Sequence, residues 1–447
     1  MGDRGGDGTE VRGPVPPPCS EGCGRLKIPA RGPGTGRRHH RRGGGSTARR
    51  AQDLMRGAQS MARLAKLPPI HADLHACTMC GACVPVCPAY QEAGWESASP
   101  RGRVFALRQY DMRGPLDRIL RRQVVPGEAF ARAAWECTGC GACEEVCPAD
   151  IPFDSFWDDV KGWMVNSGFA RKELEPYLVN VQETRNLYGE PHEDRAKWMP
   201  AEAVQSSRPE VVYWVGCVAS YRKQQIAKAV VKILNAAKVP YRILGAEEWC
   251  SGAPLARMGY EDYVRKQLMR HNIEAVAETG AKALVTACAE CYRAFRKDYR
   301  TWGGNPPFSV FHLSEYIERL VREKRLTFTK PLPEKFAFHD ACNMGRVCGA
   351  FEPPRRAIKY LKDVKLLEMF PAREDALCSG GGGGFPDVYA GQAADVASRR
   401  LQAAADTGAG ALVTACPHAE VHLERIARDR NMAVRILDLA EVVVQGL

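Results

Sequence analysis

The sequence predicts two kinds of structure in one chain, an all-helical module followed by a duplicated α/β region built on parallel sheets. Three observations support this fold class. One cysteine motif occurs twice, with helical segments between the copies. From residue 210 onward, apolar strands alternate with helices, which is typical of a parallel sheet covered on both faces. A ten-residue segment of this second half also recurs almost unchanged, which indicates an internal duplication.

A basic tail precedes the helical module. Residues 1–70 are rich in Gly, Pro and Arg and have no apolar periodicity, so we expect them to be disordered, with Met55 and Met61 as alternative starts. They hold fourteen Lys or Arg and five Asp or Glu, so most of the net charge of +11 lies here. The nearly neutral remainder argues against a protein that binds nucleic acid. No uncharged apolar stretch of about 18 residues is present, so no membrane-spanning helix is expected.

The dominant feature of the helical module is the motif C-x-x-C-x-x-C-x-x-x-C-P, present twice. This is the bacterial ferredoxin run, in which thiolates hold 4Fe-4S clusters. Zinc is the alternative for paired C-x-x-C motifs, but the third cysteine and the Cys-Pro ending argue against it in both copies. In two-cluster ferredoxins the fourth cysteine of each run ligates the other cluster. We therefore expect two clusters: cluster A on Cys77, Cys80, Cys83 and Cys147, and cluster B on Cys137, Cys140, Cys143 and Cys87.

The segment between the motifs is long and helical in character, unlike that of a small β-type ferredoxin. Apolar periodicity predicts helices in this segment at residues 104–112, 116–123 and 128–135, and a further helix after the second motif at residues 154–165. An all-helical two-cluster ferredoxin domain is therefore expected over residues 71–188. Residues 189–209 carry Pro, Glu and Ser without periodicity and are predicted to be a linker.

The second half contains two copies of one unit. Residues 279–288 recur as residues 407–416 with nine of ten positions identical, and the C-S-G at 250–252 recurs at 378–380 with the same offset of 128. This predicts cysteine-rich repeat 1 at 210–330 and repeat 2 at 331–447. Buried strands are expected at residues 211–215, 283–286, 336–338 and 411–414, with helices at residues 260–278 and 388–406.

Each repeat places cysteines at the carboxyl ends of predicted parallel strands, the edge where α/β sheets bind ligands. The candidate metal ligands are Cys217, Cys250, Cys288 and Cys291 in repeat 1, and Cys342, Cys378 and Cys416 in repeat 2. Ala419 occupies the position of repeat 2 that corresponds to Cys291, so repeat 2 lacks one of the four ligands. Cys348 and His418 are spare candidates. The alternative is that these cysteines are buried as small apolar residues. We expect a third iron–sulfur cluster in repeat 1, and zinc or no metal in repeat 2.

The glycine run at residues 380–384 does not have the spacing of a dinucleotide-binding motif, and the chain has no P-loop. A partner must therefore supply any flavin or nicotinamide chemistry. The chain has eighteen cysteines, and the metal-ligand spacing of most of them fits a reducing compartment. We expect the protein in the cytoplasm or against the inner face of the cell membrane.

Two further segments carry a resemblance to a known family. Residues 99–103 (S-P-R-G-R) and residues 339–342 (H-D-A-C), followed by Gly345 and Arg346, are similar to segments of the D-type subunit of heterodisulfide reductase. Relatives of that protein include the iron–sulfur subunits of glycolate oxidase and of anaerobic glycerol-3-phosphate dehydrogenase. The resemblance covers residues 71–447.

In that family each repeat has the pattern C…C-C-G…C-x-x-C, whose five thiolates hold a noncubane 4Fe-4S cluster, and paired clusters reduce a disulfide. Here Ser251 and Ser379 replace the second cysteine of C-C-G. The resemblance thus implies an electron-transfer subunit of a multi-subunit oxidoreductase, passing single electrons between a flavoprotein or membrane cytochrome and the cysteine-rich region. The alternative is a catalytic thiol–disulfide reductase subunit that uses a cluster in repeat 1.

Overall fold

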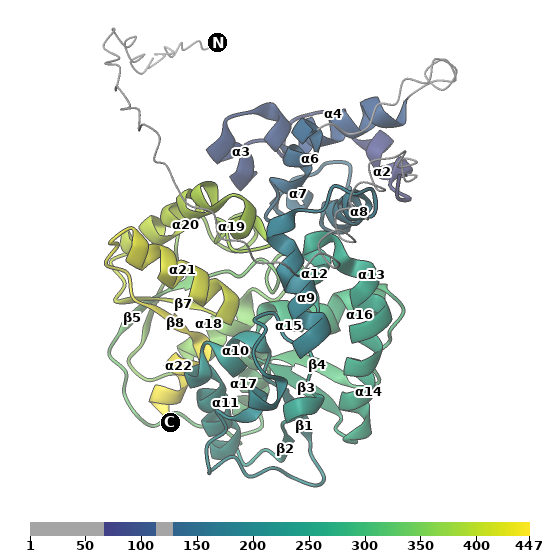
Figure 1. The fold of residues 1–447 in the computed structure, drawn as a ribbon. Coiled ribbons are helices and arrows are strands. Elements are labelled where there is room, and N and C mark those ends of the chain that lie inside the picture. The colour runs from purple at the N-terminus through teal and green to yellow at the C-terminus, as the bar shows by residue number, and fades with distance from the viewer. Residues whose placement is uncertain (1–66, 113–127) are drawn as a thin grey trace, which may run out of the picture. The chain divides into compact units, whose positions relative to one another are not determined.

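The computed structural model describes residues 67–112 and 128–447 (Figure 1). The predicted tail, up to residue 66, and the predicted helix at 116–123 lie outside the described residues. Within the described part, two four-stranded parallel sheets follow a helical N-terminal region, so the predicted fold class is confirmed. None of the helices described in these two ranges has the length and apolar character to cross a membrane.

The described residues before the first sheet contain helices and no strand. Helices α4, α6 and α8 confirm three of the predicted helices, and α4 begins four residues earlier than expected. The Ser99 side chain accepts a hydrogen bond from Gly102 N at 3.0 Å, which caps α4 one residue before Pro100. The helices are α2 (His71–Ala76), α3 (Pro88–Ala93), η1 (Glu96–Ala98), α4 (Pro100–Asp111), α6 (Glu128–Trp135), α7 (Ala142–Glu145), α8 (Phe153–Asn166), η2 (Lys172–Leu174), α9 (Glu175–Thr184) and η3 (His192–Ala196).

Repeat 1 forms a parallel sheet in the order β2-β1-β3-β4, with strands β1 (Val211–Trp214), β2 (Tyr241–Arg242), β3 (Ala283–Thr286) and β4 (Ser309–His312). Strands β1 and β3 are buried along their whole length, as expected for a sheet covered on both faces. The principal helices are α10 (Cys217–Tyr221), α11 (Gln224–Ala236), α14 (Arg270–Glu278) and α17 (Leu313–Arg322). Further helical segments are η4 (Gly245–Glu247), α12 (Ala253–Leu255), η5 (Ala256–Tyr260), α13 (Glu261–Tyr263), η6 (Val264–Met269), α15 (Ala289–Arg293), η7 (Ala294–Asp298) and α16 (Tyr299–Thr301).

Repeat 2 has the same topology, in the order β6-β5-β7-β8, with strands β5 (Lys335–His339), β6 (Lys365–Leu367), β7 (Ala411–Thr414) and β8 (Ile436–Asp438). The duplication extends to the helix that follows the fourth strand of each unit. His312 ends β4 and Asp438 ends β8, and each of them forms a capping box with the glutamate three residues later. The helices are α18 (Glu352–Lys359), η8 (Arg373–Asp375), α19 (Phe385–Val388), α20 (Ala390–Ala405), α21 (Pro417–Asp429), α22 (Leu439–Val443) and η9 (Val444–Gly446).

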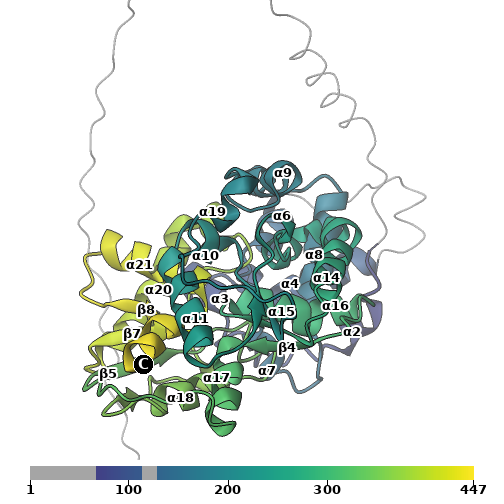
Figure 2. The ribbon, with the colours of Figure 1, turned by 90° about the horizontal axis from the view of Figure 1, so that it is seen from below.

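The two repeats lie side by side, with α11 against α22 and α17 against α18 (Figure 2). Helix α8 of the helical region packs along η5 of repeat 1. The contact is close because residue 259 is glycine. A Cβ atom there would lie 2.7 Å from the carbonyl oxygen of Lys161, and the backbone at Gly259 has a φ of +83°.

Buried ion pairs cross this contact between α8 and repeat 1. The Arg293 guanidinium lies 2.7 Å from Asp154 of α8 and 3.2 Å from Asp298 of its own repeat. Arg257 pairs with Asp158 of α8 at 2.9 Å. All five side chains are buried. Removing one partner of such a pair leaves an uncompensated charge, so the network fixes the position of α8 on repeat 1.

Lys161, also on α8, joins three parts of the chain. Its buried ammonium donates to the carbonyl oxygens of Cys137 at 3.1 Å, Arg257 at 3.1 Å and Gly383 at 3.4 Å. These carbonyls belong to the second cysteine motif, repeat 1 and repeat 2. The ammonium also lies 5.6 Å from the centre of the Trp135 ring. Desolvation lowers the pKa of Lys161, and the three acceptors offset the cost of burying its charge.

We expect Lys161→Met to lower the free energy of unfolding by about 3 kcal/mol, because three buried carbonyls lose a charged donor while the packed stem is retained. The measurement is anaerobic urea denaturation of the cluster-loaded protein. Lys266→Met is the matched control, because Lys266 is exposed and forms an ion pair with exposed Asp262 of the adjoining helical segment α13. That variant should change stability by less than about 0.5 kcal/mol. Equal effects of the two substitutions would contradict the role given to Lys161.

Candidate metal centres

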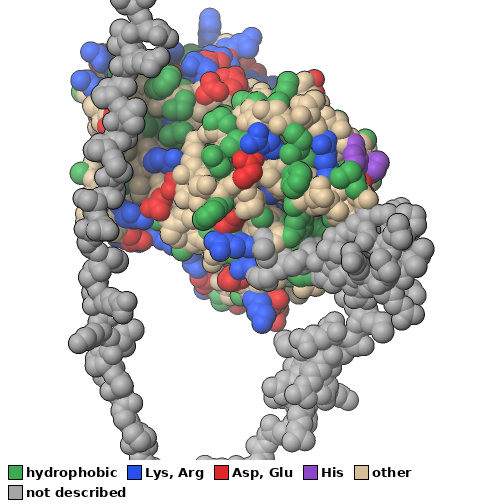
Figure 3. Space-filling model, turned by 90° about the horizontal axis from the view of Figure 1, so that it is seen from above, with side chains coloured by type: hydrophobic (Ala, Val, Ile, Leu, Met, Phe, Trp, Pro, Cys, Tyr) green, Lys and Arg blue, Asp and Glu red, His purple; other side chains and the backbone are tan. Residues whose placement is uncertain are grey.

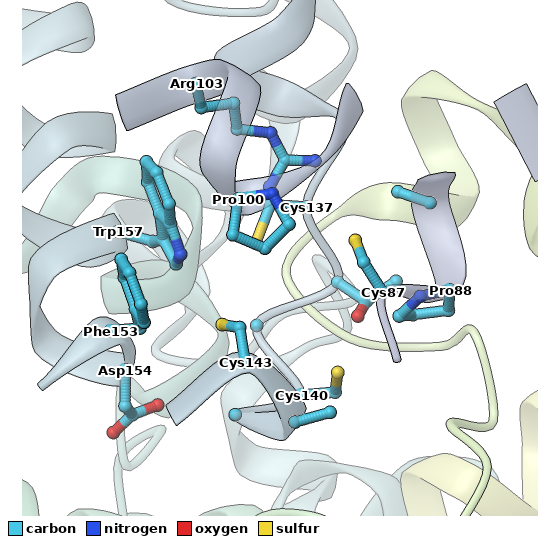
Figure 4. A pocket seen from close by; sticks show the side chains of 15 residues that line it. Cys87, Pro88, Pro100, Arg103, Cys137, Cys140, Cys143, Phe153, Asp154 and Trp157 are labelled. Atoms are coloured by element: carbon cyan, nitrogen blue, oxygen red, sulfur yellow. The ribbon is translucent and has the colours of Figure 1, made fainter. Parts of the chain in front are cut away.

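Cysteines of both ferredoxin motifs meet around one cavity of about 420 Å³ (Figure 4). Its lining includes the four cysteines assigned to cluster B, which are Cys137, Cys140, Cys143 and Cys87. Figure 4 shows these side chains around one space, with the rings of Phe153 and Trp157 on one side of it. The fourth cysteine of the first motif therefore lies beside three of the second, which is the crossed arrangement expected of a two-cluster ferredoxin.

Arg103 lies over this cavity and carries a buried positive charge. Its guanidinium donates to the carbonyl oxygen of Ala98 at 2.6 Å and to that of Glu136, and it stacks 5.5 Å from the Trp157 ring centre. Burial acts to lower the pKa of Arg103, but the nearby thiols of Cys137 and Cys87 outweigh it and raise that pKa. A fixed cation at this position stabilises negative charge on thiolates and on a reduced cluster.

The cysteines assigned to cluster A line a second cavity, of about 320 Å³. They are Cys77, Cys80, Cys83 and Cys147, together with Arg101 of α4. Cys80 is exposed, whereas Cys137 and Cys140 of the cluster B cavity are buried. Cys80 is thus the most exposed cysteine of the two cavities, while Cys143 of the cluster B cavity is half-buried.

Repeat 1 contains a third cavity of this kind, of about 330 Å³, next to the carboxyl ends of β1 and β3. Its cysteines are Cys217, Cys250, Cys288 and Cys291, and all four are buried. Ser251 also faces this group, with its hydroxyl 3.3 Å from the Sγ atom of Cys291. Gly216 permits the close approach of the backbone, because a Cβ atom there would lie 3.2 Å from the same sulfur and its φ is +79°.

An arginine that sequence reasoning missed lies beside this cavity. The buried guanidinium of Arg195 has nitrogens 3.8 and 3.9 Å from the Sγ atom of Cys217, and it pairs with buried Glu248 at 2.6 Å. Glu248 in turn accepts hydrogen bonds from the backbone N–H groups of Val215 and Gly216. The hydrogen bond with Cys250 and the charge of Arg195 lower the pKa of the Cys217 thiol, which favours the thiolate.

Arg195 lies in the segment at 189–209 that the sequence predicts to be a linker. The structure places a short helix there, at His192–Ala196, and buries Arg195 and Trp198. No periodic pattern marks these residues, and an isolated tryptophan was the one signal that the segment packs against a core.

The structure divides the three candidate cysteines of repeat 2 between two neighbours. Cys378 packs against Cys140 of the cluster B cavity, and Cys342 contacts the same group. Cys416 lies against Cys288 of repeat 1, and the hydrogen bond between these thiols lowers the pKa of Cys416. Repeat 2 therefore presents its cysteines to the sites on either side of it.

The two spare candidates and the second serine are not among the residues that line the four-cysteine cavities. Cys348 lines an open pocket with Tyr292 and Arg296, away from the four-cysteine cavities. His418 forms an ion pair with Glu290 at 3.4 Å. The Ser379 hydroxyl accepts a hydrogen bond from Gly381 N at 3.4 Å, so it takes part in the glycine-rich turn.

A larger cavity of about 900 Å³ adjoins the repeat 1 site. Glycines of the run at 380–384 line it together with Tyr177, Asp387, His418 and Arg425. Leu187, Pro254 and Glu290 line both this cavity and the repeat 1 cavity. The two cavities therefore share part of their wall.

We expect Arg195→Met to lower the free energy of unfolding by about 3–5 kcal/mol, because it leaves Glu248 as a buried carboxylate without its cation. The double variant Arg195→Met/Glu248→Gln removes both charges, and its amide oxygen still accepts from one of the two backbone donors, Val215 N or Gly216 N. It should recover most of the loss in anaerobic urea denaturation. A double variant as unstable as the single one would show that the ion pair is not the cause.

Comparisons with known proteins agree with this architecture. Residues 73–151 match the family of 4Fe-4S dicluster domains, and residues 211–296 and 336–424 match the family of cysteine-rich domains. The chain is 32% identical over 387 residues to the D-type subunit of the dihydromethanophenazine:CoB--CoM heterodisulfide reductase of Methanosarcina acetivorans. The match covers 84% of this chain and 94% of that protein. The corresponding protein of Methanosarcina mazei gives the same identity and coverage.

A more distant relative is the EtfAB:quinone oxidoreductase of Syntrophomonas wolfei subsp. wolfei. It is 28% identical over 352 residues, a match that covers 70% of this chain and 48% of that protein. The resemblance drawn from the sequence motifs is confirmed, and the dicluster domain indicates iron–sulfur clusters. This chain belongs to the iron–sulfur protein family of the D-type subunits of heterodisulfide reductase.

Proposed function

We propose that this chain is an electron-transfer subunit of a multi-subunit oxidoreductase, carrying single electrons between a partner and the repeat 1 site. The observation that supports it best is the set of three cavities, each lined by four cysteines. When bound there, 4Fe-4S clusters supply one-electron chemistry. Soft thiolates are the ligands that such clusters prefer, and the repeat 1 cavity is similar in volume to the cluster A cavity, at about 330 and 320 Å³.

The ligand sets we propose follow the three cavities. Cluster A takes Cys77, Cys80, Cys83 and Cys147; cluster B takes Cys137, Cys140, Cys143 and Cys87; a third cluster takes Cys217, Cys250, Cys288 and Cys291. Repeat 2 holds no cluster of its own in this proposal. Its Cys378 packs against Cys140 and its Cys416 against Cys288, so it fills the space between the cluster B and repeat 1 sites.

The side chains around these sites suit electron transfer. Cys80 is exposed, so the cluster A cavity is the one that a partner reaches from solvent. Arg103 and Arg195 place one buried cation beside the cluster B and repeat 1 cavities respectively. Each guanidinium favours the extra electron at its site by charge attraction in a low-dielectric surrounding.

The partner we propose is a flavoprotein or a membrane cytochrome, in the cytoplasm or at the inner face of the cell membrane. One relative is named for a heterodisulfide reductase and another for a quinone oxidoreductase, so both are named for redox enzymes. Such a partner would supply the two-electron chemistry for which this sequence has no flavin or nicotinamide fingerprint.

A second candidate function is thiol–disulfide reduction at repeat 1. The observation that favours it is the cavity of about 900 Å³ that shares Glu290, Leu187 and Pro254 with the repeat 1 site. Cleavage of one disulfide to two thiols consumes two electrons and two protons, so two successive one-electron deliveries would be needed. The replacement of a family cysteine by Ser251 makes this the second choice.

The test is the iron, sulfide and zinc content of anaerobically purified protein, with EPR before and after reduction. The proposal expects about twelve irons per chain, at four per cube. Cys291→Ala should lower the content to about eight irons, whereas the control Cys348→Ala should leave it unchanged. About eight irons in the wild type, with no effect of Cys291→Ala, would remove repeat 1 from the electron path. Disulfide turnover with a strong one-electron donor would favour the second candidate.

Ser251→Cys restores the C-C-G of the family repeat and adds a fifth thiolate at the cavity. We expect this variant to show a new paramagnetic signal on oxidation, recorded by EPR, that the wild type lacks. Ser379→Cys is the matched control, since that side chain takes part in a turn of repeat 2. An unchanged spectrum of the Ser251→Cys protein would show that position 251 does not reach the cluster.

A further inference from the structure

Two histidines and one aspartate converge on the surface of the helical region, outside the cysteine cavities. His71 and His75 lie one turn apart on α2, and Asp111 is the last residue of α4. His71 Nδ1 and His75 Nε2 each lie 2.8 Å from the same oxygen, Oδ2 of Asp111. Figure 3 shows a group of histidine side chains exposed on this face.

The arrangement matches what a divalent transition metal requires. Residues i and i+4 of a helix share one face, so both imidazoles point toward α4. One ligand atom from each of the three residues lies within 4.8 Å of the others. Two imidazoles and a carboxylate are ligands that zinc takes, with water completing the coordination. Among the residues that the structure describes, these three form the group of His, Cys, Asp and Glu side chains whose ligand atoms lie close enough together to bind a single metal ion.

The backbone around the three side chains is held independently of them. Arg108, one turn before Asp111, donates to the carbonyl oxygens of Leu74 at 2.7 Å and His75 at 3.1 Å, and to that of Cys77. Leu74 and Leu107 are buried in the same contact between α2 and α4. The two helices therefore keep their spacing without a metal, so the three ligands are placed in advance of binding.

We propose that His71, His75 and Asp111 form a binding site for a divalent transition-metal ion of the zinc class. The metal replaces the hydrogen bonds that the two imidazoles make to Asp111 and ties the start of α2 to the end of α4. Since α2 ends at Ala76 and Cys77 follows it, the metal braces the first cysteine of the cluster A cavity. This site does not depend on the proposed function of the chain.

The experiment is equilibrium dialysis of the cluster-loaded full chain against Zn²⁺, followed by metal analysis. Loading the clusters first occupies their cysteines. The wild type should retain one more zinc ion per chain than His71→Ala/His75→Ala, and the same number as His271→Ala. His271 is the matched control because it is half-buried, stacks on Trp249 and bonds to the carbonyl of Glu247. Equal zinc in the wild type and the double variant would overturn the proposal.

Asp111→Asn separates metal binding from the hydrogen bonds between the helices. The amide oxygen still accepts from an imidazole, but a neutral amide is a poorer zinc ligand than a carboxylate. We expect at least a tenfold weaker zinc affinity for this variant, with unchanged cluster absorption. Zinc should slow hydrogen exchange of residues 71–76 in the wild type and not in Asp111→Asn. Slowing of equal size in both proteins would also overturn the proposal.

Discussion

The buried ammonium of Lys161 is the contact on which the arrangement of this protein depends. It donates to carbonyls of the second cysteine motif, repeat 1 and repeat 2, which are far apart in the sequence. The ion pairs of Arg293 and Arg257 hold the same helix, α8, against repeat 1. Buried charges contribute little net stability when well paired, but they penalise every arrangement that leaves one of them unpaired. The interface is therefore specified by its polar groups, and α8 is the element that holds the cysteine motifs against the α/β half.

Duplication supplied two equal scaffolds, and their sites then diverged. Both repeats keep the strand order and the terminal capping box. Repeat 1 keeps Gly216, with its positive φ, against the sulfur of Cys291. Repeat 2 has Ala341 before Cys342, without a positive φ, and Ala419 where the fourth cysteine would stand. In repeat 2 the glycine and the cysteine that it approaches are therefore both replaced. The close backbone approach at Gly216 has a purpose only where the sulfur of Cys291 is present.

Local patterns in the sequence predicted the elements well. Helix α6 and strands β3 and β7 have the expected boundaries, because buried apolar runs and helical periodicity are local signals. The motif spacing grouped the same cysteines that the structure brings to each ferredoxin cavity. Arg195 could not be found in this way, since its role depends on Glu248 and Cys217, which fold onto it from other elements. The contacts of Cys378 with Cys140 and of Cys416 with Cys288 were likewise outside local reasoning, because they arise from how whole units pack.

The burial of Cys140 bears on how the proposed cluster B would be assembled. Its side chain packs against Cys378 of repeat 2, and the carbonyl of neighbouring Cys137 is held by Lys161. Cys137 and Cys140 are both buried in the packed arrangement. A cluster B of the kind proposed above would therefore form most readily before the α/β half packs against these thiols. Cluster A, beside the exposed Cys80, would stay within reach of solvent in the folded protein.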